Sequence, residues 1–279
     1  MIKFLQNLPQ VFTVAALFAV LSILPVYTPG IPAAAEENEK GTTSNEQDAA
    51  NIKPIVDPSA DALLKEMGNT LKSAGELSFN ANITFDELLP SGQKIQFGGE
   101  ASVTVKRPNL LHAVYNGDLH SRKIWYSGDE VTVLNTDDNF YGQLKVPATL
   151  DETMDYLMKD YGFTLPLADI VFSDPYGSLM KNVRAGVVVG NSSINGSECR
   201  HLAFVEKYID WQLWVSGGVE KLPCKLVITY KTVPGSPQYT AVFSEWNLGP
   251  EGSESIFKPV IPKRAARIDF IKLANQEGG

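Results

Sequence analysis

The side chains best suited to chemistry in this sequence are three histidines and two cysteines. His112 and His120 are eight positions apart on different expected strands, and His201 stands alone near a cysteine. The sequence has no His-Glu-x-x-His zinc motif, no Gly-x-Ser-x-Gly nucleophile motif and no phosphate-binding glycine loop followed by Lys-Ser/Thr. Isolated histidines of this kind are typical of structural positions. The sequence therefore predicts no catalytic residue, no bound metal and no cofactor, and the protein is not expected to be an enzyme.

The two cysteines favour a structural disulfide. Cys199 and Cys224 are 25 positions apart and flank two strand-like segments, so a bridge would join neighbouring or next-but-one strands. A redox pair usually has the spacing Cys-x-x-Cys, and a zinc site needs more ligands than His201 supplies. An oxidising compartment favours pairing, which in the chain-entropy model is worth about 3–4 kcal/mol.

The remaining candidate site is apolar. Three of the five methionines lie on helices expected in the middle of the chain, and methionine adapts to ligands of varied shape. Two interpretations stay open, because such stripes either pack on a sheet as core or line a ligand cavity. On the strand 210–215, alternation places Trp211 and Leu213 on one face, expected to be inward, and Trp214 on the other, where it could mark a partner surface. The candidate ligand-binding residues are Met154, Leu157, Met158, Leu179, Met180, Trp211 and Leu213.

Caps and apolar periodicity predict the helices that would carry these residues. Asp57 followed by Pro58 is typical of a helix start, and one apolar stripe follows it as far as residue 74. Thr149 with Glu152 forms a capping box before a second stripe. Two shorter helices are expected at 166–172 and from Asp174 onward.

Strict alternation of apolar and polar residues predicts about eleven strands, at the spacing of a meander. An antiparallel sheet of that size curls or closes, and its concave face is where the helices can bury their stripes. The expected fold is mainly β, of the α+β class. The main strand segments are 77–85, 93–105, 110–115, 122–126, 130–134, 140–146, 187–189, 199–205, 210–215, 225–230 and 238–243, and a last strand is expected at 267–273.

The first residues are typical of an export signal. An uncharged run at 11–24 follows Lys3 and precedes three alanines ending at Ala35, and it is shorter than the roughly 20 residues of a spanning helix. We expect residues 1–35 to be a signal peptide cleaved near Ala35, with an uncleaved membrane anchor as the alternative. Residues 36–56 are polar and predict a disordered leader. A single domain at 57–273 and a flexible tail at 274–279 complete the expected organisation.

Composition limits the function classes. The 279 residues are 44% hydrophobic and 20% charged, with a net charge of −8. These values exclude collagen-like, coiled-coil and wholly disordered proteins, and they disfavour nucleic acid as a partner. Together with the export signal they predict a periplasmic protein that is not an integral membrane protein once processed.

Several local strings are distinctive when taken together. They are residues 161–169 (YGFTLPLAD), 210–215 (DWQLWV), 222–223 before 225–230, 237–240 and 246–248. From about residue 58 to 273 the chain thereby resembles an uncharacterised bacterial family of predicted periplasmic proteins, which is similar in fold to the LolA- and LppX-type lipoprotein carriers. This resemblance implies a curved antiparallel half-barrel of about eleven strands at 57–273, with helices on the concave face. It also implies binding of acyl chains or lipidated proteins there.

The resemblance has one departure. The lipoprotein carriers hold their helical lid through an arginine on an early strand, whereas the first arginine here is Arg107. The strands at 77–85 and 93–105 therefore lack that residue.

Three functions remain for comparison. The first is a periplasmic carrier or sensor that binds a lipid, an acyl chain or a lipidated protein in a concave apolar cavity. The second is an envelope protein-interaction or regulatory module without a lipid ligand. A hydrolase has the least support, because no nucleophile with a base is visible in the sequence.

Overall fold

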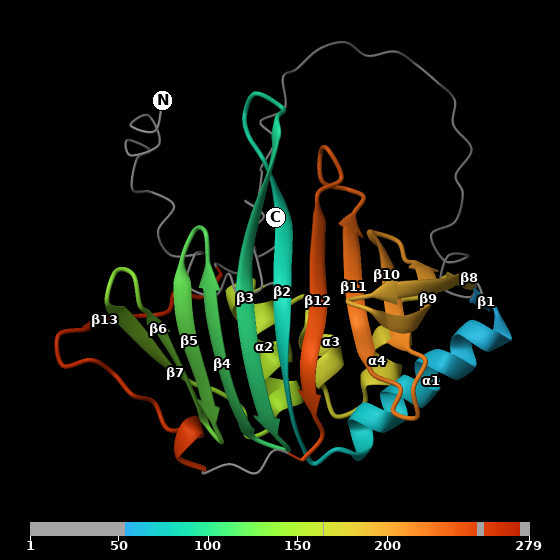
Figure 1. Cartoon of the computed structure of the whole chain (residues 1–279). Helices are drawn as coiled ribbons and strands as arrows, with labels where there is room; N and C mark the ends of the chain where they lie inside the picture. Colours follow the sequence, from blue (N-terminus) through green and yellow to red (C-terminus); the bar gives the residue numbers. More distant parts are fainter. Residues whose placement is uncertain (1–53, 164, 250–253, 274–279) are drawn as a thin grey trace, which may run out of the picture.

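A computed structural model describes residues 54–163, 165–249 and 254–273, and in these residues one curved sheet carries helices on its concave side (Figure 1). The described sheet has thirteen strands in the order β1-β8-β9-β10-β11-β12-β2-β3-β4-β5-β6-β7-β13. It is open, because β1 and β13 lie at opposite ends. The predicted α+β fold, a curved half-barrel with helices on the concave face, is confirmed.

The strands form two meanders placed side by side. The first is β2 (Glu76–Leu88), β3 (Lys94–Lys106), β4 (Leu110–Gly117), β5 (Ser121–Ser127), β6 (Glu130–Asn135) and β7 (Phe140–Lys145). The second is β8 (Ala185–Ile194), β9 (Ser197–Val205), β10 (Ile209–Ser216), β11 (Pro223–Tyr230) and β12 (Gln238–Asn247). Antiparallel pairing of β12 with β2 joins the two meanders in the middle of the sheet.

Two short strands form the ends of the sheet; β1 was not expected, whereas β13 lies at the start of the strand expected at 267–273. β1 (Ile55–Val56) pairs with β8, and β13 (Ala266–Ile268) pairs with β7, both in parallel. Ile55 and Val56 fall at the end of the segment expected to be a disordered leader. The expected signal peptide, most of that leader and the expected tail at 274–279 lie outside the described residues.

The helices begin where their caps predict. α1 (Pro58–Ser73) starts after Asp57, whose Oδ1 accepts the Ser59 N–H at 2.7 Å. α2 (Leu150–Tyr161) starts at the capping box, in which Thr149 Oγ1 accepts the Glu152 N–H and donates to the Glu152 carboxylate. The shorter α3 (Ala168–Val171) and α4 (Pro175–Met180) follow, and a 3-10 turn, η5, spans Glu254–Phe257.

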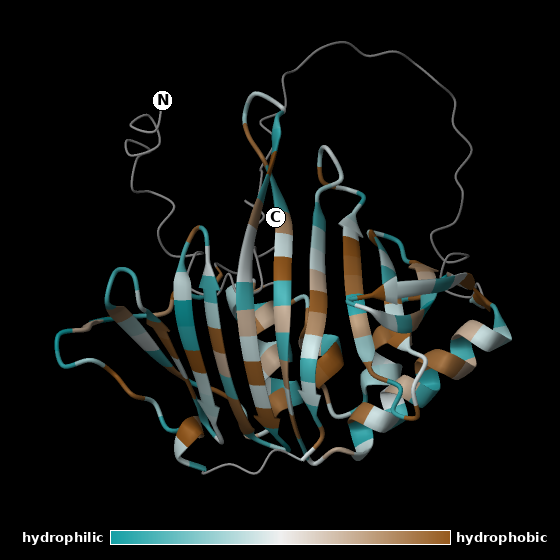
Figure 2. Cartoon of the chain, viewed as in Figure 1, coloured by the Kyte–Doolittle hydropathy of each residue, from teal (hydrophilic) through white to brown (hydrophobic). Residues whose placement is uncertain are grey.

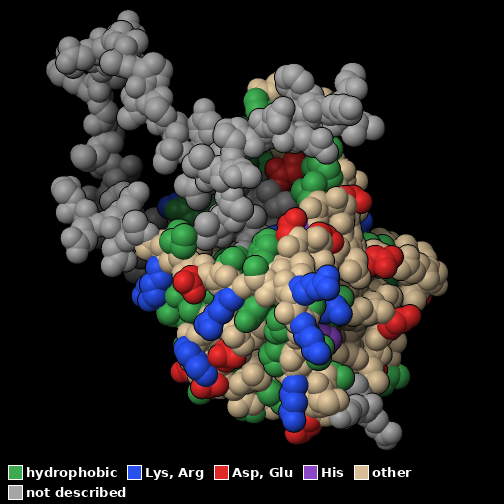
Figure 3. All heavy atoms as spheres, turned by 90° about the vertical axis from the view of Figure 1, so that its left-hand side faces the viewer, with side chains coloured by type: hydrophobic (Ala, Val, Ile, Leu, Met, Phe, Trp, Pro, Cys, Tyr) green, Lys and Arg blue, Asp and Glu red, His purple; other side chains and the backbone are tan. Residues whose placement is uncertain are grey.

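The main core lies between the sheet and the helices. Hydrophobic and hydrophilic bands alternate along the strands, as expected for a sheet with one buried face (Figure 2). At the β13 end of the sheet, basic and acidic side chains are interspersed on the surface (Figure 3). The charge of the chain is therefore mixed rather than gathered by sign on this face.

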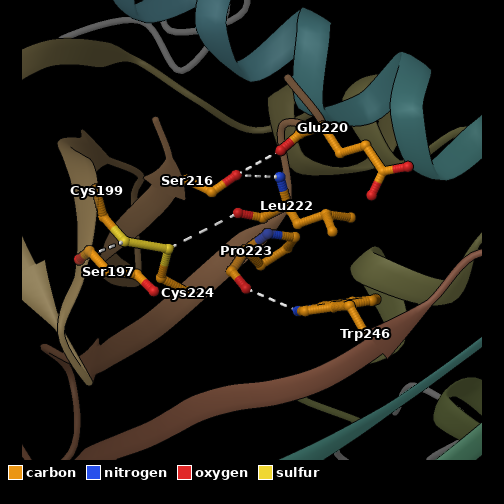
Figure 4. Close-up of a disulfide and its surroundings, with 8 residues drawn as sticks. All are labelled: Ser197, Cys199, Ser216, Glu220, Leu222, Pro223, Cys224 and Trp246. Atoms are coloured by element: carbon orange, nitrogen blue, oxygen red, sulfur yellow. Dashed lines mark hydrogen bonds between the residues drawn. A yellow bond between two sulfur atoms is a disulfide. The ribbon is translucent and has the colours of Figure 1, made fainter. Parts of the chain in front are cut away.

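A second, smaller hydrophobic cluster lies on the opposite face of the sheet. It surrounds the disulfide, whose prediction is confirmed. Cys199 of β9 and Cys224 of β11 are bonded, with their Cα atoms 6.8 Å apart (Figure 4). The bridge thus joins next-but-one strands across β10. Trp214 packs in this cluster, under the His201 ring at 3.9 Å between centroids, and is only 8% exposed. It faces outward as expected, but its neighbours cover it.

Candidate functional site

An apolar cavity of about 70 Å³ lies between the first meander and the helices. The polar side-chain atoms in its wall are the hydroxyl groups of Thr153 and Tyr126, and both donate hydrogen bonds within the protein. Thr153 Oγ1 donates to the Pro147 carbonyl at 2.9 Å, and the Tyr126 hydroxyl donates to the same carbonyl at 3.0 Å. A cavity with such walls stays dry and suits an apolar ligand. Its lining is Phe79, Ala101, Val103, Leu111, Ala113, Ile124, Tyr126, Val131, Leu150, Thr153, Met154, Leu157, Leu165, Leu167, Ala168 and Val171.

Small side chains on the sheet create this space. Ala101 of β3 and Ala113 of β4 point toward the helices from neighbouring strands. α2 covers them with Met154 and Leu157, which reach down from one face of the helix. The volume of about 70 Å³ is below the ~150 Å³ of an engineered cavity that binds benzene, so the space in this arrangement is too small for a large ligand.

One continuous piece of chain, residues 147–184, covers the cavity; we call it the cover segment. It leaves the sheet after β7, contains α2, α3 and α4, and returns at β8. Within it, the Asp151 carboxylate accepts the Ser173 N–H at 3.0 Å and the Ser173 hydroxyl at 2.5 Å. The helices of the cover segment are therefore tied to one another.

Arg107 fastens the cover segment to α1. It is the first residue after β3, and its Nη1 donates to the carbonyls of Leu71 and Ala74 at 3.2 and 2.6 Å. Its Nη2 donates to the carbonyls of Val171 and Phe172 at 3.1 and 2.9 Å. Carbonyls at helix C-termini lack intrahelical partners and attract cations, so one guanidinium holds the ends of α1 and α3. Burial lowers the pKa of Arg107, which the Asp151 charge partly offsets.

The sequence reasoning missed Arg107 because its partners are main-chain carbonyls, which leave no residue-type signal. The expected strands at 77–85 and 93–105 do lack an arginine. The arginine that contacts the helices stands immediately after the second of them.

A second cavity, of about 160 Å³, lies under the second meander and is partly polar. The Glu206 carboxylate accepts the Trp211 Nε1–H at 2.9 Å, and the Asp169 carboxylate accepts the Ser178 hydroxyl. Burial raises the pKa of both carboxyl groups. The lining residues are Pro166, Asp169, Ser178, Leu179, Asn182, Glu206, Ile209, Trp211, Leu226 and Ile228.

The structure divides the seven predicted ligand-binding residues among different places. Met154 and Leu157 line the apolar cavity, whereas Leu179 and Trp211 line the partly polar one. Met158 borders an open cleft of about 400 Å³ with Asp155 and Lys181. Met180 and Leu213 pack in or against the core, and Leu213 is fully buried.

The histidines lie apart from both cavities. His112 stacks on Trp125 with ring centroids 5.5 Å apart, and His201 contacts Gln212 at 3.0 Å. In the described part of the chain, no three His, Cys, Asp or Glu side chains are grouped as a metal site requires. Among the same residues, no helix has the length and apolar character needed to cross a bilayer.

Comparison with solved structures finds similar folds at low identity. Lipoprotein LppX from Mycobacterium tuberculosis is 14% identical, with a TM-score of 0.45, covering 68% of this chain and 96% of LppX. LprF from Mycobacterium bovis is 15% identical, with a TM-score of 0.44, covering 75% of this chain and 99% of LprF. A LolA superfamily protein from Nitrosomonas europaea is 10% identical, with a TM-score of 0.35, covering 72% of this chain and 97% of that one.

Comparison with curated proteins found no match. A family model described as "Predicted periplasmic protein (DUF2092)" matches residues 60–271. This range contains the strings that carried the resemblance to a periplasmic family, and the resemblance is confirmed. The chain belongs to the DUF2092 family of predicted periplasmic proteins.

Proposed function

We propose that this protein is exported to the periplasm and binds a long apolar group there, either a lipid acyl chain or the acyl chain of a lipidated protein. The apolar cavity under the cover segment carries the proposal. Its wall is apolar, and its two polar side chains are satisfied within the protein. A water molecule would find no free hydrogen-bond partner in such a space, whereas an apolar chain would be removed from water and would contact apolar side chains.

Binding requires the cavity to open. Ligand pockets usually measure about 300–1,000 Å³, so a volume of about 70 Å³ holds no acyl chain. The cover segment is attached to the sheet strands at its two ends, β7 and β8, and it contributes half of the cavity wall. A ligand that binds only the opened form would shift the population toward it.

Export completes the proposal. Residues 1–35 have the charge and apolar pattern of a signal peptide, and the family is described as periplasmic. We propose cleavage near Ala35, so that residues 36–279 form the mature protein. It would act as a carrier or a sensor of the bound chain.

The test is mass spectrometry of an organic extract of the mature protein purified from a native-like periplasm. We expect a stoichiometric lipid that is absent from a control periplasmic protein. An Ala113→Leu variant, which fills the cavity, should lose this lipid, and Val114→Leu, which changes the opposite face of the same strand, should keep it. A clean extract from folded wild-type protein that also fails to bind added palmitate would contradict the proposal.

A second candidate function is protein interaction in the envelope, and the edge at β8 favours it. β1 pairs with β8 at Ala185 and Gly186, and among the described strands none borders the rest of β8 on that side. Val187 and Val189 are 52% and 56% exposed there. Exposed strand edges accept further strands. A photo-crosslinker at Val187 should then capture one defined envelope protein in vivo, and a crosslinker at Lys123 should not.

A further inference from the structure

A buried arginine stands beside the apolar cavity. Arg122 of β5 is 2% exposed, and its Nε and Nη1 atoms have no hydrogen-bond partner among the described residues. A buried guanidinium is normally paired or fully hydrogen-bonded, because an unpaired buried charge is costly. Its position therefore calls for a partner from outside the described chain.

The strand register places Arg122 on the cavity side of the sheet. Arg122 lies opposite Tyr115 of β4, and Tyr115 lies opposite Ala101 of β3. Residues directly opposite on neighbouring strands share one face. Ala101 lines the cavity, as does Ile124, which is two residues from Arg122 on the same strand. Two residues along a strand span roughly 7 Å, so Arg122 follows the lining residue Ile124 just beyond one end of the cavity.

Two acidic residues of the turn after β6 interact with Arg122 through charge, without a hydrogen bond to its Nε or Nη1. Asp137 and Asp138 act on Arg122 through space, but Asp137 Oδ2 accepts the Ser121 N–H at 2.6 Å. The cross-strand neighbour Asn135 uses its Oδ1 to accept the N–H groups of Asp137 and Asp138, at 3.0 and 2.9 Å. Neither Nε nor Nη1 of Arg122 donates a hydrogen bond to any of these groups.

The same end of the core holds neutral hydrogen-bond donors. Burial raises the pKa of Tyr115 to about 12 and that of Tyr239 well above its ordinary value, so both are uncharged phenols at neutral pH. The Tyr239 hydroxyl also has no hydrogen-bond partner in the described residues. Burial lowers the pKa of Arg122 to about 10, and it remains a cation at neutral pH.

The room for Tyr115 depends on two glycines. Its ring lies over Gly99 of β3 and Gly117 of β4, where a Cβ atom at either position would collide with the ring. Because these two positions have no side chain, the Tyr115 ring can pack against the sheet next to Arg122. A charged group and a phenol at the end of an apolar space match a ligand with one polar end.

We propose that Arg122 receives the anionic head of an amphiphile whose acyl chain occupies the apolar cavity. This inference rests on the proposed function and narrows it to ligands with a carboxylate or phosphate head. A bidentate contact from a guanidinium is strong and specific for such heads in a site without water.

Binding to mature protein stripped of co-purified lipid tests the inference, with palmitate, hexadecyl phosphate and uncharged methyl palmitate as probes. We expect one or both anions to bind about 10- to 100-fold more tightly than the ester, as for a hydrogen bond to a charged group. The order of palmitate and hexadecyl phosphate distinguishes the two head groups. Acetate and inorganic phosphate, which lack a chain, should bind far more weakly.

Variants of Arg122 separate recognition from folding. Arg122→Met should abolish the preference for the anion while leaving the affinity for the ester within about 2-fold, and Arg122→Lys should keep part of the preference. Lys123→Met removes an exposed charge on the opposite face and should change nothing. Arg122→Met should also raise the Tm of the ligand-free protein, because it removes an unpaired buried charge.

Several results would overturn the inference. If the wild type binds palmitate and its methyl ester with equal affinity, the inference fails and the proposed function stands. The inference also fails, with the proposed function intact, if Lys123→Met loses the preference for the anion as Arg122→Met does. Binding of inorganic phosphate as tightly as hexadecyl phosphate would show a free-anion site instead. If no long-chain probe binds folded protein, the proposed function fails together with this inference.

Discussion

The two meanders of this sheet lie under the same layer of helices, yet they meet it differently. In the cavity half, β2–β7, Ala101 and Ala113 leave a dry space. In the disulfide half, β8–β12, Phe204 and Trp211 stack with ring centroids 4.1 Å apart, and the cavity beside Trp211 is partly polar, with Asp169 and Glu206 in its wall. The chemistry of the inward side chains, rather than the volume of the cavity, decides which half suits an apolar ligand.

The halves also differ in how they are held. A disulfide ties β9 to β11 on the outer face of the disulfide half. Over the cavity half, the cover segment is held by hydrogen bonds, including the two from Arg107 to the Val171 and Phe172 carbonyls. Since hydrogen bonds open and reform far more readily than a disulfide, we expect motion to concentrate over the cavity half.

The largest expected effect is on the disulfide half. Replacing both Cys199 and Cys224 by serine should lower the free energy of unfolding by about 3–4 kcal/mol, measured by urea denaturation. Amide exchange should accelerate in β9–β11 with little change in β3–β5. Equal acceleration in both halves would break the comparison, because the bridge would then stiffen the whole sheet.

Arg107→Met should have the next largest effect. Losing the guanidinium leaves the carbonyls at the ends of α1 and α3 without partners and should destabilise the protein by about 2–3 kcal/mol. Palmitate should associate faster in stopped-flow experiments, because the cover segment is less firmly held. Arg184→Met, which removes an exposed arginine, is the matched control. An unchanged association rate in Arg107→Met would show that this arginine does not limit opening.

Filling the cavity tests the role of small side chains. Ala113→Leu adds a side chain of about the size of the cavity, so stability should stay within about 1.5 kcal/mol. The affinity for palmitate, measured by calorimetry, should fall at least about 10-fold, or roughly 1.4 kcal/mol. Val114→Leu should bind as the wild type does. Full binding by Ala113→Leu would place the ligand elsewhere.

The smallest effect concerns pH. Burial raises the pKa of Glu87 in β2 to about 7, from 4.5. A folded-state pKa above the unfolded value means that the folded protein binds the proton more tightly, so this group lowers stability as pH rises from about 4.5 to 7. Glu87→Gln should therefore raise the Tm at pH 8 but not at pH 4, by the equivalent of less than about 1 kcal/mol for this half-exposed group. Glu100→Gln, at an exposed position, should show no such difference.

The two halves also differ in the hydrogen bonding of a partly buried carboxyl group, Glu87 in one and Glu206 in the other. Its Oε1 has no partner among the described residues, whereas Glu206 in the disulfide half accepts the Trp211 N–H. Replacing Glu206 by leucine should therefore remove a hydrogen bond as well as the carboxyl group. The Tm of Glu206→Leu should fall at all pH values, whereas Glu206→Gln keeps an amide oxygen that can accept the Trp211 N–H.

Local signals predicted much of the fold. The caps at Asp57 and Thr149 depend on contacts two or three residues away, and both helices begin there. The expected helix at 166–172 is shortened to Ala168–Val171. Alternation identified the long strands and the start of the last one, which is shortened to β13. It did not identify β1, because a strand of two residues is specified by its neighbour rather than by its own pattern.

The candidate site was only partly predictable. Periodicity identified the apolar face of α2, and Met154 and Leu157 line the cavity. It did not reveal that Leu179 and Trp211 meet a different, partly polar space. Arg107 and Arg122 carry no motif, and their surroundings come from strands and helices far away in the chain.

The sequence by itself determined which faces are apolar, where helices start, which cysteines pair and to which family the chain belongs. These properties follow from residue type and short-range spacing. Tertiary structure alone decided that small residues of β3 and β4 meet α2, that Arg107 lies at two helix ends and that Arg122 is buried beside the cavity. Each depends on side-chain volumes and charges brought together from distant positions, and no local pattern encodes the space left between them.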